Sequence, residues 1–361
     1  MLNNNTFGNN FRVSTFGESH GPALGVIVDG CPSDFTLDLE LIRHELNRRK
    51  PGQSRLVSPR NETDDFEILS GLFEGKTTGT PIAAIFRNND VRSKDYSEIK
   101  DLFRPGHADF TYHKKYNHRD YRGGGRSSAR ETISRVFAGG IAKQLLAPIG
   151  IIIEGGLSQV GRIKAEKFLY DFAEDNIVRG LDPDKVEEMI NEIETARKDR
   201  DSVGGVLSLR ARGVPAGIGE PVFSKLSAAI GGAMFSIPAV KGVEIGGGFS
   251  LSEERGSSAN DEMRSTGFQS NNHGGILGGI SSGAPIEIKI AIKPTSSLPK
   301  TQRTVTTEGI ESEIVTKGRH DPCVAIRAVP IAEAMLALVL IDLLLIHYGK
   351  EHIKEKITNK A

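Results

Sequence analysis

Cysteine is almost absent from this sequence, since Cys31 and Cys323 are the two thiols in 361 residues. Two thiols are too few for a disulfide framework or a cysteine-built metal site, and such scarcity is typical of a reducing compartment. The N-terminus, Met1-Leu2-Asn3, lacks the basic-then-apolar pattern of a signal peptide. We therefore expect a cytoplasmic protein without a metal site.

A net charge is lacking as well, because 46 lysines and arginines balance 46 aspartates and glutamates. Proteins that bind nucleic acid through a broad basic surface usually carry a positive excess. The balance therefore argues against a general nucleic-acid binder, and any basic stretch must be a local concentration of charge.

A charge-free apolar run long enough to cross a membrane is also missing. The most apolar segment, residues 331–346, is interrupted by Glu333 and Asp342, whereas a membrane span needs about twenty consecutive, predominantly apolar residues. We interpret the segment as a buried core or subunit-interface helix, and we expect no membrane partner.

No repeat and no low-complexity linker divides the chain, so we expect residues 1–361 to form a single domain. The hydrophobic periodicity predicts strands that run antiparallel beside several long helices, which indicates an α+β fold. The predicted strands are 11–16, 23–28, 78–86, 151–163, 203–212, 240–245, a strand that ends at 292, and 324–328. The predicted helices are 38–49, one that begins after residue 128, 182–200, 223–236 and 331–346.

The densest chemistry lies in residues 104–132, where seven positive charges face three negative ones. Three glycines at 123–125 lead into a helix start, in which Ser128 and Glu131 match the S-x-x-E capping box. Glycines allow the backbone to approach a ligand closely, and a helix N-terminus favours an anion. The stretch therefore suits phosphate or carboxylate, for which Arg126 and Arg130 would supply forked donors.

Two other interpretations of residues 104–132 stay open at this point. A solvated basic loop could simply cap an ordinary helix, and the interleaved aromatic residues would suit a groove for single-stranded nucleic acid. The stretch by itself does not separate an enzyme from a binding protein.

Ser19 and His20 stand between two glycines at a predicted strand end, a favourable place for a site. We do not expect them to act as a nucleophile pair, because adjacent residues of an extended segment point to opposite faces. A histidine whose hydrogen bonds are satisfied within the loop is the plain alternative.

A second glycine-rich zone occupies residues 273–283, and the strand after it leads to a polar segment at 293–297. Glycines beside small hydroxyl residues suit close backbone approach to a flat or phosphorylated ligand. A tight loop between strands would explain the same composition.

Charged residues gather at two more places, near 48–55 and 319–321. Arg48 and Arg49 end a predicted helix, where cations complement its dipole, although an anion site is the sharper alternative. Arg, His and Asp at 319–321 indicate either a salt network at a helix end or a carboxylate positioned for proton transfer.

Taken together, these segments resemble the chorismate synthase family of the shikimate pathway. The resemblance rests on the signatures at 17–21, 104–132, 274–283 with 293–297, and 318–323 with 328–330, which occur in the family's order. It implies a β-α-β sandwich, with long helices packed between antiparallel sheets, assembled as a homotetramer.

The resemblance also implies a flavin-dependent lyase. Such an enzyme eliminates phosphate and the C6 proton from 5-enolpyruvylshikimate 3-phosphate to give chorismate, and it requires reduced FMN although no net oxidation occurs. Holding a multiply charged substrate against a flavin in a dry pocket would explain why arginines stand beside so many glycines.

Site residues are implied position by position. His20 matches the histidine beside the flavin, and His107 the histidine that faces the substrate. Asp321 with Ser19 matches the proposed relay that takes the substrate proton by way of flavin N5. The implied FMN positions are Arg126, Ser127, Ser128, Ala239, Gly278, Lys293, Pro294, Thr295, Ser296, Ser297 and Arg319. The implied anion positions are Arg49 and Arg55, for NADPH or substrate, and Arg48 and Arg130, for substrate.

Two alternatives compete with this interpretation. A phosphate-handling transferase without flavin would account for the arginines but not for the two glycine-serine zones. A nucleic-acid-binding protein would bind in a strongly salt-dependent manner and would need no small substrate.

Overall fold

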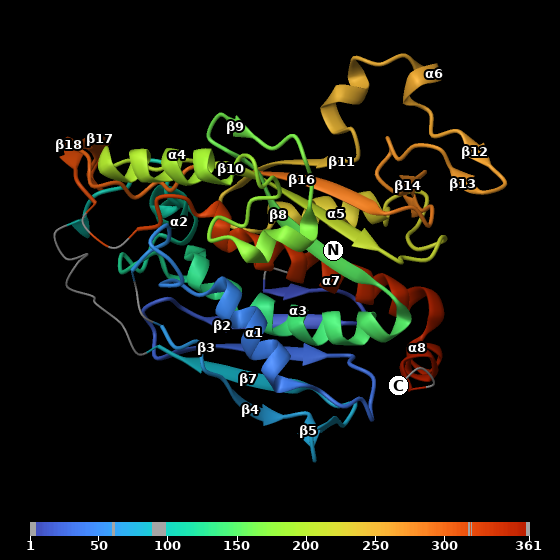
Figure 1. Ribbon diagram of the computed structural model, residues 1–361. Helices are drawn as coiled ribbons and strands as arrows, with labels where there is room; N and C mark the ends of the chain where they lie inside the picture. The colour runs from blue at the N-terminus through green and yellow to red at the C-terminus, as the bar shows by residue number, and fades with distance from the viewer. Residues whose placement is uncertain (1–4, 60–61, 89–98, 317, 319, 359–361) are drawn as a thin grey trace.

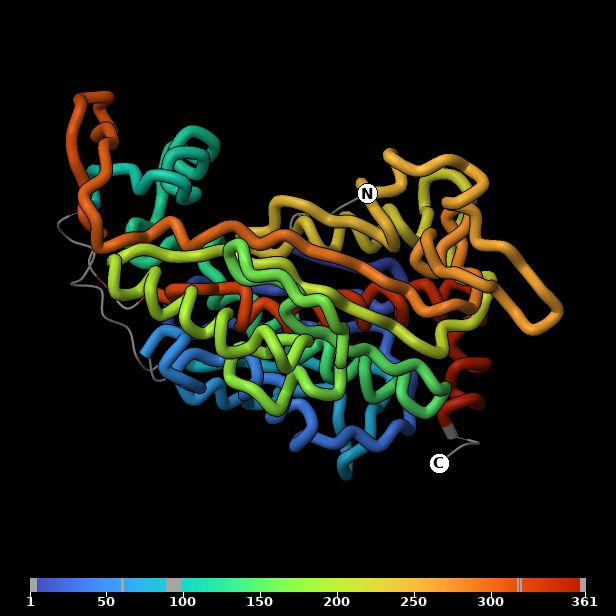
Figure 2. The backbone as a smooth tube through the Cα atoms, turned by 45° about the horizontal axis from the view of Figure 1, so that its top comes forward, coloured from blue at the N-terminus to red at the C-terminus, as the bar shows by residue number. Residues whose placement is uncertain are grey.

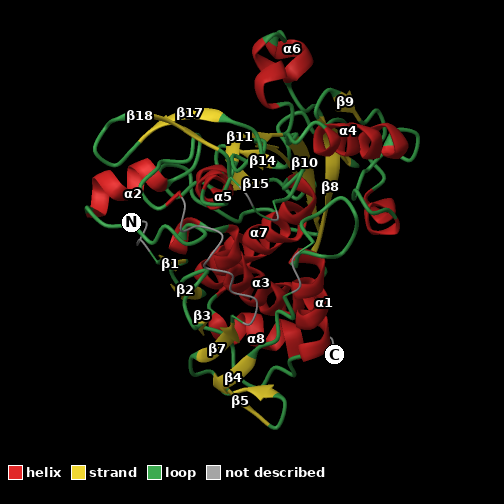
Figure 3. Ribbon diagram, turned by 90° about the vertical axis from the view of Figure 1, so that its left-hand side faces the viewer, coloured by secondary structure: helices red, strands yellow, loops and turns green. Residues whose placement is uncertain are grey.

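Two five-stranded antiparallel sheets enclose a layer of helices in the computed structural model, which describes residues 5–59, 62–88, 99–316, 318 and 320–358 (Figure 1). The first sheet has the order β1-β2-β3-β7-β4, formed by Thr6–Phe7, Arg12–Gly17, Ala23–Asp29, Ile82–Arg87 and Glu67–Ser70. The second has the order β11-β16-β10-β8-β9, formed by Val240–Ile245, Ile286–Ile292, Gly205–Arg212, Ile152–Val160 and Ile163–Lys164. Helices α1 (Leu39–Arg49), α3 (Thr132–Leu146) and α7 (Ala325–Tyr348) lie between them (Figure 3). The predicted sandwich is confirmed.

Alternation along the strands explains why each sheet buries one face. In β3, Leu24, Val26 and Val28 are fully buried, and in β16 the isoleucines at 286, 288, 290 and 292 are buried on the same side. Side chains two apart share a face of a strand, so both sheets turn an aliphatic surface towards the helices. The central helices must therefore be apolar on more than one side.

Helix α7 is the centre of this core. It is long and apolar enough to pass for a membrane span, yet 94% of its most apolar window is buried inside the protein. The two acids that interrupt it have internal partners: Asp342 accepts the backbone N–H groups of Asn10 and Phe11, at 2.6 and 2.8 Å, and Glu333 pairs with Arg48 at 2.7 Å. The prediction of a buried core helix is confirmed.

The predicted strand at 324–328 is wrong, because these residues form the N-terminal part of α7. The β-branched residues and Pro330 suggested an extended segment, since proline lacks the N–H that continues a helix and disfavours it just before. Here the helix runs through Pro330. Arg179 donates to the carbonyl of Ile326, four residues before the proline, at 3.2 Å.

The remaining elements lie around this sandwich. At one end, α2 and the β17–β18 hairpin project side by side, and at the other an arm carries α6 and β12–β13 (Figure 2). Helices α4 and α5 flank the second sheet, and α8 follows α7. Their bounds are α2 Asp109–Tyr116, α4 Val186–Lys198, α5 Leu226–Phe235, α6 Gly256–Ala259 and α8 Lys350–Thr358. The short strands are β5 Leu72–Phe73, β6 Lys76–Thr77, β12 Met263–Arg264, β13 Gly267–Phe268, β14 Ile276–Leu277, β15 Ile280–Ser281, β17 Gln302–Val305 and β18 Glu311–Ile314.

Candidate functional site

A cavity of about 390 Å³ lies where several distant parts of the chain meet: Pro51, Ser58 and Glu62, and the segments 104–108, 123–132, 237–239, 293–297 and 320–331. Its volume falls in the range of small-molecule sites, roughly 300–1,000 Å³. Apolar side chains from Ile237, Val324, Ala328 and Ile331 line part of it, and charged and hydroxyl groups line the rest. Such a surface suits a ligand with a flat apolar body and anionic substituents.

The segment 293–297 contributes all five of its residues to the lining. The Lys293 Nζ donates to the carbonyl of Gly106 and to the Ser296 Oγ, both at 2.7 Å, and Thr295 Oγ1 donates to the Asp321 carbonyl at 2.9 Å. Burial lowers the pKa of Lys293, and the charge of Lys241 lowers it further. The segment 293–297 is thereby hydrogen-bonded to the turn at 104–108 and to Asp321, just before α7.

The glycine turn at 123–125 runs along another side of the cavity. All three glycines have positive φ values, of 69°, 103° and 55°, which side chains rarely adopt. Ser127 and Ser128 line the cavity, whereas the Arg126 guanidinium turns to β2, donating to Thr15 Oγ1 at 2.7 Å. The turn therefore brings the two serines to the cavity without Arg126.

The capping box expected at Ser128 forms only in part. The Ser128 hydroxyl accepts the N–H of Arg130 at 3.3 Å, but it opens a short 3-10 turn, and α3 begins at Thr132. Glu131 does not complete the box, because its carboxylate pairs with Arg135 one turn later at 2.8 Å.

His107 lines the cavity and contacts a buried ion pair, formed by Arg104 and Asp109. Its Nδ1 is 3.1 Å from Asp109 Oδ1, and Arg104 holds the same carboxylate with two bonds, at 2.7 and 2.8 Å. Burial alone would raise the pKa of Asp109, but the hydrogen bonds from Arg104 and His107 hold it well below its usual range. Asp109 thus places an ionised carboxylate within ion-pair distance of the imidazole.

Ser19 and His20 form a contact that we did not expect. The Ser19 Oγ and the His20 Nδ1 are 3.2 Å apart, because the two residues lie in a turn rather than an extended strand. Both face Gly123, which lines the cavity. The pair therefore lies next to the cavity, and Gly123 separates the two.

Asp321 lines the cavity and is held from two sides. Its Oδ1 accepts the backbone N–H of Ser58 at 2.8 Å, and its Oδ2 pairs with Arg327 Nη1 at 2.7 Å. Arg327 in turn donates from Nε to the carbonyl of Arg49 at 2.9 Å. A carboxylate at the cavity surface is thereby tied to both α7 and the end of α1.

Two of the predicted anion-binding arginines share one buried acid. The Asp64 carboxylate pairs with Arg49 at 2.5 Å and also with Arg130, which lines the cavity and contacts Glu62 at 2.9 Å. Burial would raise the pKa of Asp64, but the charges of Arg49 and Arg130 keep it below the usual value. Arg49 is completely buried behind this pair.

Besides Ser19, His20, Arg49 and Arg126, three predicted positions that the structure describes lie outside this lining: Arg48, Arg55 and Gly278. Arg48 joins a separate buried network beside a hollow of about 340 Å³, and Arg55 is exposed and pairs with Glu194 at 2.7 Å. Gly278 lies between β14 and β15, away from the cavity lining. Arg319 lies outside the described residues.

Sequence reasoning missed several lining or supporting residues, notably Arg104, Asp109, Asp64 and Arg327. The pattern Arg104-x-x-His107-x-Asp109 contained a usable signal, because it places an acid beside both cations. Much of the positive charge of residues 104–132 is balanced internally by such pairs, including Arg122 with Asp120 at 2.8 Å. The nucleic-acid interpretation loses its main support.

Comparison with known proteins gives a family match and a structural match. The family model described as chorismate synthase matches residues 11–345. A solved structure described as "Crystal Structure of Chorismate Synthase" is similar with a TM-score of 0.77 and 33% sequence identity, covering 98% of each chain. The family match spans the cavity and all of its lining segments, and the chain belongs to the chorismate synthase family.

Proposed function

We propose that the cavity of about 390 Å³ is where this chain carries out the reaction of its family. That reaction removes phosphate and the C6 proton from 5-enolpyruvylshikimate 3-phosphate to give chorismate, with reduced FMN as cofactor and no net redox change. The observation that carries the assignment is the meeting of His107, Asp321 and Arg130 on one cavity that also has apolar walls.

The lining fits a flavin. Ala239 has a φ of 71°, a strained backbone value for a residue with a side chain, and its carbonyl accepts the Lys293 N–H at 2.9 Å. Together with Ile237, Val324 and Ala328, it forms an apolar surface for the flavin ring. The residues that would hold FMN are Ser127, Ser128, Ala239 and the segment 293–297. When bound there, reduced FMN would supply transient electron donation to the substrate, with no net redox change.

We infer that His107 and Asp321 handle the two charge changes. His107, oriented by Asp109, would balance the negative charge that grows on the departing phosphate. Asp321 would accept the proton lost from C6, with Ser58 and Arg327 fixing its carboxylate in position. Ser19 and His20 would act from beside Gly123, where the imidazole can donate to the cofactor.

Arg130 would bind the substrate anion directly, because it lines the cavity. Arg49 would support it through the shared Asp64, and its complete burial favours a substrate-side role over a contact with NADPH. Arg55 is exposed and would make such a contact only at the surface. The test is to supply oxidised FMN and NADPH with no other reductant. Reduction of the flavin would show an NADPH site, whereas no reduction together with full turnover on chemically reduced FMN would support the substrate-side role.

Three broader proposals concern the chain as a whole. We propose that it folds as one domain, which the shared core cluster from Phe11 to Ile357 supports. We also propose a cytoplasmic homotetramer, supported by exposed aromatic residues such as Phe223 and Phe249, which are 94% and 78% exposed. Sedimentation equilibrium would give the number of subunits.

The deciding experiment is an anaerobic assay of the purified protein with 5-enolpyruvylshikimate 3-phosphate and chemically reduced FMN. We expect chorismate and inorganic phosphate to appear in equal amounts. If folded protein with reduced flavin releases neither product, the assignment fails and a phosphate-handling enzyme without flavin becomes the leading candidate.

A further inference from the structure

The carboxylate of Asp321 depends on two neighbouring elements for its position. Its Oδ1 is held by the N–H of Ser58, in the segment 50–58 that follows α1, and its Oδ2 by Arg327, in the first turn of α7. The distance from Asp321 to a ligand in the cavity therefore changes if either element shifts.

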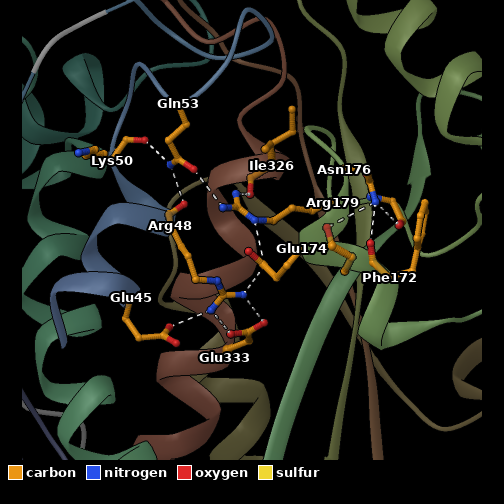
Figure 4. A network of polar contacts seen from close by, with 12 residues as sticks. Glu45, Arg48, Lys50, Gln53, Phe172, Glu174, Asn176, Arg179, Ile326 and Glu333 are labelled. Atoms are coloured by element: carbon orange, nitrogen blue, oxygen red, sulfur yellow. Dashed lines mark hydrogen bonds and ion pairs between the residues drawn. The ribbon is translucent and has the colours of Figure 1, made fainter. Parts of the chain in front are cut away.

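Arg179 contacts both of these elements from outside the cavity (Figure 4). Its Nη1 donates to the Ile326 carbonyl in the first turn of α7 at 3.2 Å, and its Nη2 donates to Gln53 Oε1 at 3.0 Å. Gln53 in turn donates to the carbonyls of Arg48 and Lys50, at 2.7 and 2.5 Å, where α1 ends. One guanidinium thus joins the segment 50–58 to the helix that carries Arg327.

The contact with Ile326 has a physical reason in Pro330. In an α-helix the Ile326 carbonyl would accept the N–H of residue 330, but proline has none, so the usual donor is missing. Leaving a buried carbonyl without a donor is costly. Arg179 supplies a donor from another part of the chain, and it does so next to Arg327.

Arg179 is itself held firmly. Only 7% of it is exposed, its Nε donates to Glu174 at 3.2 Å, and Glu174 also pairs with Arg48 at 2.7 Å. Arg48 belongs to the same buried network through Glu333. Because Nε, Nη1 and Nη2 each donate a hydrogen bond, the guanidinium has a fixed position. It can therefore hold its partners in place, which a mobile surface arginine cannot do.

We propose that Arg179 is a positioning residue for the reaction, which holds the first turn of α7 and the segment 50–58 together and so sets the place of Asp321. The proposal rests on the proposed role of Asp321 as proton acceptor. Arg179 touches neither the cavity lining nor any reacting atom, so its effect must be transmitted through Ile326 and Gln53.

The test is a double-mutant cycle between Arg179→Ala and Pro330→Ala, because Pro330→Ala restores the backbone N–H that Ile326 lacks. Arg179→Ala alone should lower kcat about tenfold, with KM for the substrate changed less than about twofold, since a buried acceptor is left unsatisfied. The primary kinetic isotope effect with substrate deuterated at C6 should rise, because proton removal becomes slower. In the double variant, kcat should recover at least about threefold, whereas Pro330→Ala alone should stay within about twofold of wild type.

Gln53→Ala provides an independent check, since Gln53 is exposed and we expect the variant to fold. It should lower kcat and raise the isotope effect in the same direction as Arg179→Ala, by a smaller factor. Arg212→Ala is the matched control, because it removes an arginine paired with a glutamate, Glu154 at 2.9 Å, on the second sheet. It should leave both quantities unchanged.

The outcomes separate the two proposals. If Arg179→Ala and Gln53→Ala lower only the melting temperature and keep the wild-type isotope effect, Arg179 has no positioning role. If Pro330→Ala gives no recovery, the place of Asp321 is not set through the Ile326 carbonyl. If Asp321→Asn itself turns over at the wild-type rate, the role of Asp321 fails first and the positioning proposal fails with it.

Discussion

Gly123 and His20 approach each other so closely that a Cβ atom at position 123 would stand 2.2 Å from the His20 Cε1. The next residue repeats the arrangement, since a Cβ atom at Gly124 would stand 2.9 Å from the His107 Cε1. Two histidines from distant segments therefore lie against successive glycines of one turn. Glycine at these positions is required by space as well as by backbone conformation.

We expect Gly123→Ala to displace His20 and to lower kcat by at least about tenfold, because a methyl group cannot fit between the turn and the ring. Gly150→Ala is the matched control, since Gly150 also has a positive φ, of 89°, but nothing within 4 Å of the added atom. Both variants should lose about 1 kcal/mol of stability from backbone strain. Equal effects of the two variants on kcat would contradict the packing argument.

His107→Ala should retain FMN binding yet lose most turnover, because the charge on the departing phosphate is no longer balanced. Removal of one positioned catalytic group commonly costs about 10²- to 10⁴-fold. Flavin binding is measured by fluorescence titration, and turnover by phosphate release. His347→Ala, at the exposed end of α7, serves as the control. Turnover close to wild type in His107→Ala would remove His107 from the mechanism.

Asp321→Asn should slow proton removal, since the amide keeps the shape of the side chain but cannot accept the proton as a carboxylate does. The measurement is the kinetic isotope effect with substrate deuterated at C6, which should increase as kcat falls. Binding of FMN should change little. An unchanged rate would place the base on another residue.

Acid should destabilise the fold through Glu333. Burial would raise the pKa of Glu333, but Lys143 and Arg48 hold it well below its usual 4.5. A carboxyl group whose pKa is lower in the folded state stabilises the protein above its unfolded pKa, and the stabilisation is lost as the pH falls through the folded pKa. Urea unfolding should therefore show stability declining as the pH drops below about 4.5.

Glu333→Gln supplies the comparison for this pH dependence. It should cost about 1–3 kcal/mol at pH 7, because Arg48 and Lys143 each lose one partner and keep Glu45, and it should flatten the decline in acid. Glu67→Gln, on the exposed strand β4, should reproduce the wild-type curve. A Glu333→Gln curve parallel to wild type below pH 4.5 would show that another acid governs the transition.

Both cysteines should be unreactive in the native protein. Burial raises the pKa of Cys31 and of Cys323 to about 12, and their exposed fractions are 2% and 0%. A disulfide reagent at pH 8 should titrate no thiol before unfolding and two thiols after it, because the thiolate is the reactive form. Rapid reaction of one thiol in the folded state would point to local opening around it.

Much of the fold could be predicted because its signals are local. The strands at 203–212 and 240–245 agree with β10 and β11 to within two residues, and the helix at 38–49 has Asp38 as its N-cap, with the Asp38 carboxylate accepting the N–H of Glu40. Alternation and capping depend on residues a few positions apart, so the sequence itself contains them.

The site could be predicted only in part, because its contacts join residues far apart in the chain. Arg49 and Arg130 meet at Asp64, 15 and 66 positions away, and Arg179 reaches Ile326 across 147 positions. No periodicity indicates such partners. The error at 324–328 has the same origin, since the local signal of Pro330 is overridden by a donor from a distant loop.

The place of α7 in the chain order has a consequence for biosynthesis. All ten strands of the two large sheets precede residue 325, so the ribosome makes them before the helix that fills the space between them. Until α7 emerges, the inward faces of β8 and β10, which α7 contacts in the folded protein, have no helix α7 to cover them. Such surface makes nascent chains prone to aggregate. The nascent chain should therefore need chaperone protection until late in translation. The two sheets should pack cooperatively around the helices once α7 has been synthesised.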